Sequence, residues 1–110
     1  MPMSTSVVRG NLLFSVLCGL NLTPLIVAAN TTAEQLFPFP GLLVGDFVNI
    51  SKPTSQAGLG IVNVRALANQ VGITFSNNTA AGITPTAGEL YTFGVDRYED
   101  QGLPLPTGIT

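Results

Sequence analysis

The acidic side chains carry most of the potential for chemistry in this chain of 110 residues. They are Glu34, Asp46, Glu89, Asp96, Glu99 and Asp100. Two carboxylates can act as the acid and the base of a glycosidase, and loop carboxylates can bind Ca²⁺. No spacing selects one pair, and the alternating acids of a calcium-binding loop are missing. We therefore expect turn and surface carboxylates, and no catalytic, cofactor-binding or metal-ligating residue.

Nucleophilic chemistry has few residues to use. The chain contains no histidine, which removes the Ser–His triad and the histidine metal site, and a Ser–Lys dyad would depend on Lys52 alone. Cys18 is the single cysteine and lies in an apolar run, as expected of a small buried side chain. The sequence has no glycine motif of the phosphate-binding or dinucleotide-binding kind. We expect that the protein is not an enzyme and has no cofactor.

The basic residues are few and scattered, at Arg9, Lys52, Arg65 and Arg97. Such a distribution argues against nucleic-acid binding and against a polybasic membrane surface. Charged residues make up 9% of the chain and hydrophobic ones 45%, which is not the composition of a disordered protein. A domain this short buries only part of its apolar surface. We therefore expect sister subunits or another partner to cover some of it.

Residues 10–33 contain no charge. With Arg9 before the apolar run and small residues near its end, the segment resembles a secretory signal peptide. Asn11, Asn21 and Pro24 interrupt the run, so it offers no continuous span of the length a membrane helix needs. We interpret the segment as two strands, over residues 11–18 and 25–29. A signal or anchor role remains the alternative.

The rest of the chain predicts an all-β fold, because short β-like runs alternate with turns and no apolar stripe persists at helical spacing. Further strands are expected at residues 34–39, 46–51, 60–68, 70–76 and 89–96. The result is a small antiparallel β-sandwich, jelly-roll-like or immunoglobulin-like, of about seven strands. We expect an N-terminal arm at residues 1–10, the sandwich at 11–96 and an extended tail at 97–110.

Alternation along the strands predicts the core. Val62, Val64 and Ala66 share one face of their strand, as do Val71, Ile73 and Phe75, and as do Tyr91, Phe93 and Val95. The expected core consists of Leu13, Val48, Ile50, Val62, Val64, Ile73, Phe75, Tyr91 and Phe93.

Two further features can be read as carbohydrate chemistry or as structure. Asn21, Asn30, Asn49 and Asn77 each begin an Asn-x-Ser/Thr sequence, which is a glycosylation signal in secreted proteins and a turn signal elsewhere. Tyr91 and Tyr98 have rings that can stack on sugars. We interpret the asparagines as turn residues and the tyrosines as packing residues.

The order of motifs between residues 30 and 95 resembles a known family. The motifs are NTTAEQ, G-L-x-x-G-D-x-V, S-K-P-T, I-x-N-x-R, I-T-F-x-N-x-T-A and I-T-P-T-A-G-E-x-Y, and they cover about three fifths of the chain. The pattern resembles small all-β proteins of tailed bacteriophages that decorate capsids (cement proteins) or form head fibres.

This resemblance implies a structural virion protein on the outer capsid surface, which stabilises the phage head. The implied partners are the major capsid protein and copies of the chain itself, as a trimer, with no nucleic acid and no membrane. Contacts are expected from residues 1–9, 54–60, 77–88 and 102–110. The alternatives are a head-fibre or adhesin module that binds a host glycan, and a secreted β-domain with an N-terminal signal.

Overall fold

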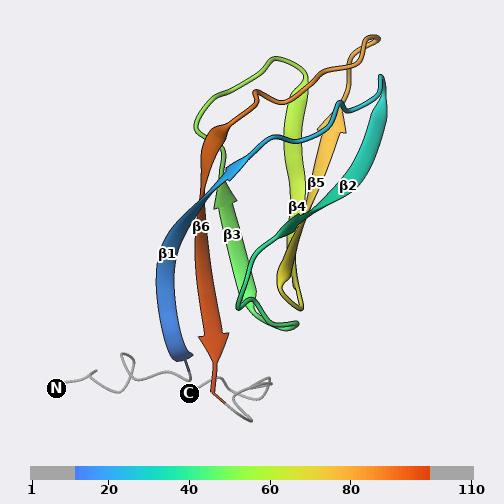
Figure 1. Ribbon diagram of the computed structural model, residues 1–110. Helices are drawn as coiled ribbons and strands as arrows, with labels where there is room; N and C mark the ends of the chain where they lie inside the picture. Colours follow the sequence, from blue (N-terminus) through green and yellow to red (C-terminus); the bar gives the residue numbers. More distant parts are fainter. Residues whose placement is uncertain (1–11, 100–110) are drawn as a thin grey trace, which may run out of the picture.

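The computed structural model describes residues 12–99 of the chain (Figure 1). This part contains six β-strands and no helix, as the all-β prediction required. The strands are β1 (Leu12–Leu22), β2 (Thr31–Pro38), β3 (Phe47–Ser51), β4 (Leu59–Leu67), β5 (Gln70–Asn77) and β6 (Glu89–Tyr98). Among residues 12–99, no helix with the length and apolar character needed to cross a membrane was found.

The strands form two antiparallel sheets of three strands each, ordered β1-β6-β3 and β2-β5-β4. Only β4 and β5 are joined by a tight turn, and the other pairings join segments far apart in the sequence. Figure 1 shows the connections between β1 and β2, β3 and β4, and β5 and β6 at one end of the molecule, while Leu12 and Tyr98 pair at the other.

The core lies between the two sheets and is supplied mainly by their central strands. In β6 the alternate residues Tyr91, Phe93 and Val95 are buried, and β5 contributes Val71, Ile73 and Phe75. The ring of Phe39 packs edge-on against Phe93 at a centroid distance of 5.3 Å. Alternation therefore gave the correct inward face for both central strands.

The strand expected at residues 25–29 is wrong. Only Val27 pairs there, in an isolated bridge with Ile83. The side-chain amide of Gln35 accepts from the Leu25 amide at 2.8 Å and donates to the Leu25 carbonyl at 2.9 Å. Gln35 thus occupies the backbone groups that a neighbouring strand would need, and Pro24 has no amide hydrogen to donate. The molecule has six strands in its described part because this segment crosses between sheets as a loop.

Two residues of the expected core, Leu13 and Val62, are also wrong, with exposed fractions of 62% and 59%. Each lies where the strand register shifts, between Leu12 and Phe14 in β1 and between Ile61 and Asn63 in β4. An extra residue in a strand reverses which side chains face the core beyond it. The remaining expected core residues are buried or partly buried.

Some strand ends differ from expectation as well. β1 continues to Leu22, β2 begins at Thr31, and β6 continues to Tyr98, two residues beyond the end expected for the sandwich. The expected arm at residues 1–10 and most of the expected tail at 97–110 lie outside the described residues.

Candidate functional site

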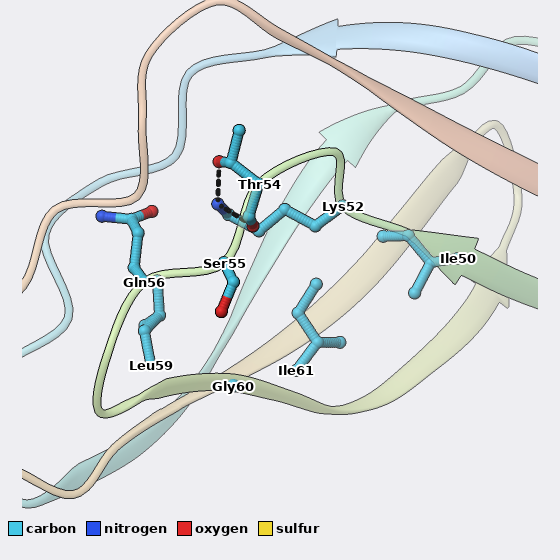
Figure 2. A pocket seen from close by; sticks show the side chains of 8 residues that line it. All are labelled: Ile50, Lys52, Thr54, Ser55, Gln56, Leu59, Gly60 and Ile61. Carbon is cyan, nitrogen blue, oxygen red and sulfur yellow. Dashed lines mark hydrogen bonds between the residues drawn. The ribbon is translucent and has the colours of Figure 1, made fainter.

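A shallow hollow of about 320 Å³ opens where β3 ends and β4 begins (Figure 2). Ile50 of β3 and Leu59 and Ile61 of β4 form its apolar wall, and the intervening loop adds polar side chains. Its lining residues are Ile50, Lys52, Thr54, Ser55, Gln56, Leu59, Gly60 and Ile61. It overlaps residues 54–60, where the sequence led us to expect contacts.

The charged group of this hollow, the ammonium group of Lys52, is already held by an ion pair and hydrogen bonds within the chain. Lys52 Nζ lies 3.1 Å from Glu89 Oε1 and donates to the carbonyl of Thr54 at 2.9 Å. The hydroxyl of Thr54 in turn hydrogen-bonds to Glu89. This hydroxyl lowers the pKa of Glu89 below its ordinary value, assisted by Lys52 and opposed by burial. Both charged side chains are largely covered, so the network ties the start of β6 to the β3–β4 loop.

Gln56 uses its polar groups in the same way. Its amide donates to the Thr84 carbonyl at 3.1 Å and accepts from the Thr86 amide at 3.0 Å. The backbone of Asn78 adds a hydrogen bond to the carbonyl of Gly58. Two of the expected contact segments, residues 54–60 and 77–88, therefore lie together at one end of the molecule. The other two, residues 1–9 and 102–110, lie outside the described residues.

Asn77 organises the loop that follows β5. Its side chain is 1% exposed and donates to the carbonyls of Val27 at 3.0 Å and Ala81 at 2.8 Å. Its carbonyl accepts from the amide and the hydroxyl of Thr79. The Asn-x-Thr sequence at Asn77 thus leads into a folded loop, in which its own Thr79 hydrogen-bonds to the asparagine side chain.

A second ion pair fastens the opposite end of the molecule. Arg97 donates to Asp46 through Nε at 2.8 Å and Nη2 at 2.7 Å, and Nη2 also reaches the Gly41 carbonyl at 2.9 Å. The hydrogen bonds from Arg97 lower the pKa of the Asp46 carboxyl, although burial acts in the opposite direction. The carboxyl also accepts a hydrogen bond from the Leu43 amide, which lowers the pKa further. The guanidinium carbon lies 4.7 Å from the centre of the Phe14 ring.

A third pair crosses the outer face of the second sheet. Arg65 of β4 donates to Glu34 of β2 at 2.6 and 2.8 Å, and this lowers the pKa of Glu34. The pair spans the central strand over Gly72, where a side chain would collide with the Glu34 carboxylate. Three of the six acids are therefore partners of the three described basic residues. Among residues 12–99, no group of three or more potential metal ligands occurs.

Tyr91 and Cys18 are packing residues. Asn21 and Asn49, which we interpreted as turn residues, lie within β1 and β3, so that interpretation is wrong for these two. The Tyr91 ring is fully buried, and burial raises the pKa of its hydroxyl to about 12, with the Glu89 charge adding to the shift. Its face is therefore inaccessible to a sugar. Cys18 is half-buried and packs against the core.

The surface that sequence reasoning missed is the outer face of the β1-β6-β3 sheet. Leu17, Phe47 and Leu90 protrude from it and are 81%, 60% and 54% exposed. Leu90 lies over Gly19, and Leu17 lies beside Gly94. The sequence signal was available in the residues that alternate with Tyr91, Phe93 and Val48, but it required the sheet order to bring the three side chains onto one surface.

Comparisons of the chain with protein-family models, with curated proteins and with solved structures found no match.

Proposed function

We propose that the protein is a structural component of a virion, a decoration or cement protein that binds the outer capsid surface of a tailed phage and stabilises the head. The observation that carries this proposal is the outer face of the β1-β6-β3 sheet. It presents large apolar side chains and little charge, which suits a surface that another protein covers. The proposed partner is the major capsid protein.

The composition of this face follows from the strand register. Its rows place Ser15 beside Asp96 and Phe47, then Leu17 beside Gly94 and Asn49. Gly19, Thr92 and Ser51 form the next row, and Asn21 lies beside Leu90. Asp96 is the one charged residue among these positions.

The order of the strands supports the same class of protein. β1 pairs with β6 and β2 with β5, so that the chain is folded as an antiparallel ribbon whose halves lie against each other. This ribbon pairing is the principle of the jelly roll, which occurs in viral capsid domains and also in lectins. The support is by analogy of fold and is weaker than that from the surface.

The distribution of charge agrees with a structural role. Within residues 12–99, Lys52, Arg65 and Arg97 are each held by a carboxylate, and each pair links two separate segments of chain. The charged groups therefore fasten loops and strands together. We infer from this that stabilising the fold is their main contribution.

The two alternatives have less support. A glycan-binding head fibre would use exposed aromatic rings, and of the two tyrosines Tyr91 is buried in the core and Tyr98 is half-buried. A secreted domain would lose its N-terminal segment, yet β1 lies within that segment and pairs with β6 along its length. Removal of β1 would leave one side of the central strand β6 without a neighbour.

Binding to capsids tests the proposal. Wild type, Leu90→Lys and Val62→Lys are added to purified heads that lack the protein, and occupancy is measured after washing and heating. Val62 is the matched control, because it is similarly exposed but belongs to the other sheet. We expect wild type and Val62→Lys to be retained and Leu90→Lys to be lost. Failure of wild type to bind, or equal retention of all three, would contradict the proposal.

A further inference from the structure

β1 is an open edge of its sheet. It is the outer strand in the order β1-β6-β3, so the backbone amides and carbonyls that point away from β6 have no strand beside them among the described residues. It is also the longest strand, with 11 residues, and contains neither charge nor proline. Leu17, Leu13 and Val16 along it are exposed. A long, uncharged and apolar edge is a template for pairing with another strand.

The other three edges each have a feature that discourages such pairing. β2 carries Glu34 and ends in Pro38, β3 has only five residues, and β4 has a bulge at Val62 and carries Arg65. Proline, charge, bulges and short length are the usual protections of edge strands. The bulge of β1 lies at Leu13, near its start, and leaves the register from Phe14 to Leu22 regular. β1 is therefore the edge strand best suited to pair with a strand of another molecule.

We propose that β1 pairs in antiparallel fashion with β1 of a second copy of this chain. The pairing is two-fold, so the same surface serves both copies and the two sheets become one continuous sheet of six strands. The absence of charge in β1 means that two copies approach without repulsion. The unpaired backbone groups of one copy provide the partners that those of the other require.

The side chains on the inner face fit this occupant. Phe14, Val16 and Cys18 line a hollow of about 170 Å³ between β1 and the loop around Leu42. Val16 remains 44% exposed there because no strand lies beyond it. In the two-fold pair, the inward residues of one β1 lie beside the inward residues of the other, since antiparallel neighbours share faces. The apolar interior of each copy then continues into the next.

The pairing does not depend on capsid binding. A dimer that never binds a capsid would support the pairing and contradict the proposed function. Two-fold pairing also yields a dimer, in contrast to the trimer that the family resemblance implies. The mass of the particle in solution therefore distinguishes the two expectations.

Analytical ultracentrifugation of the full chain tests the pairing with Leu17→Lys and Val62→Lys as matched variants. Lysine at residue 17, the middle of β1, places a positive charge of each copy close to that of the other in the two-fold pair. Val62 is the control, because it is exposed but lies in the other sheet, away from the proposed interface. We expect wild type and Val62→Lys to sediment as dimers and Leu17→Lys as a monomer with the same circular dichroism spectrum. A monomeric or trimeric wild type, or a dimeric Leu17→Lys, would overturn the proposal.

Hydrogen exchange on the wild-type protein tests the same pairing without a variant, in the event that Leu17→Lys fails to fold. Spectra are compared at protein concentrations above and below the dissociation midpoint. We expect amides of β1 to gain protection at the higher concentration, while the edge strands β2 and β4 do not change. Unchanged exchange in β1, or a gain confined to another edge, would refute the pairing.

Discussion

Asp46 is the residue on which most of the polar structure at one end of the molecule depends. Its carboxylate receives two hydrogen bonds from Arg97 and one from the Leu43 amide, and its side chain is only 2% exposed. Through Arg97 it connects the end of β6 with the loop after β2 and with Phe14 of β1. A single ion pair therefore holds three segments of the chain.

Replacement of Asp46 by asparagine tests this role. Asp46→Asn should lower the free energy of unfolding by about 1.5–3 kcal/mol, the usual contribution of a hydrogen bond to a charged group. Glu34→Gln is the control, because the Glu34–Arg65 pair is far more exposed and should contribute about 1 kcal/mol or less. Urea denaturation at neutral pH measures both. Equal losses for the two variants would show that burial of the Asp46 pair adds nothing.

The same carboxyl should make stability depend on acid. The pKa of Asp46 in the folded state is lower than its ordinary value of 3.8, so its contribution is fully present above pH 3.8 and is lost as the pH falls through the folded-state pKa. The free energy of unfolding of wild type should therefore decrease more steeply below pH 3.8 than that of Asp46→Asn. Denaturation curves at a series of acidic pH values check this. Parallel profiles for the two proteins would contradict the assignment.

At the scale of the elements, alternation was a good guide to burial except at the two bulges in the edge strands. Phe75, Phe93 and Ile73 lie in regular stretches of β5 and β6, and their period of two predicted their burial. Leu13 and Val62 follow the same pattern in sequence but occupy bulges, and a bulge depends on pairing with a distant strand. The sequence alone does not show where such a shift falls.

Loops that are held by side chains were equally hidden from sequence reasoning. The side chain of Gln35 hydrogen-bonds to the backbone of Leu25, 10 residues away in the sequence. The side chain of Asn77 hydrogen-bonds to the backbone of Val27, 50 residues away. These contacts convert an apolar run that resembles a strand into a crossing loop. Composition did not predict which acid pairs with which base.

A pair of truncations in the hydrophobic residues tests the effect of the bulge. Phe75→Ala removes a fully buried ring and should cost about 3–5 kcal/mol. Leu13→Ala removes a side chain that is 62% exposed and should change the free energy of unfolding by about 0.5 kcal/mol or less. Denaturation of both variants gives the comparison. A large loss for Leu13→Ala would place that residue in the core after all.

Deletion of residues 1–22 tests whether β1 belongs to the domain. Without β1, one side of β6 loses its whole ladder and the core loses Leu22 and the partly buried Phe14 and Leu20. We expect the shortened chain to show no cooperative thermal unfolding by circular dichroism. A shortened chain that unfolds cooperatively like wild type would favour the alternative in which this segment is a removable signal.

At the scale of the whole molecule, several of the exposed apolar residues lie on one sheet face and along one sheet edge. The face carries Leu17, Phe47 and Leu90, and the edge is β1. The two surfaces meet at Leu17, so that a pair of molecules joined through β1 would present one wider apolar face. A wide, charge-poor surface of this kind is suited to lie flat on a protein shell.

The most direct test of the central proposal is the copy number of this chain in purified particles of the tailed phage that, on this proposal, encodes it. Quantitative mass spectrometry measures that number against the major capsid protein. A cement protein covers the shell, so we expect a copy number comparable with that of the major capsid protein. A few copies per particle would instead indicate a fibre. Absence of the chain from purified particles would contradict a role in the virion altogether.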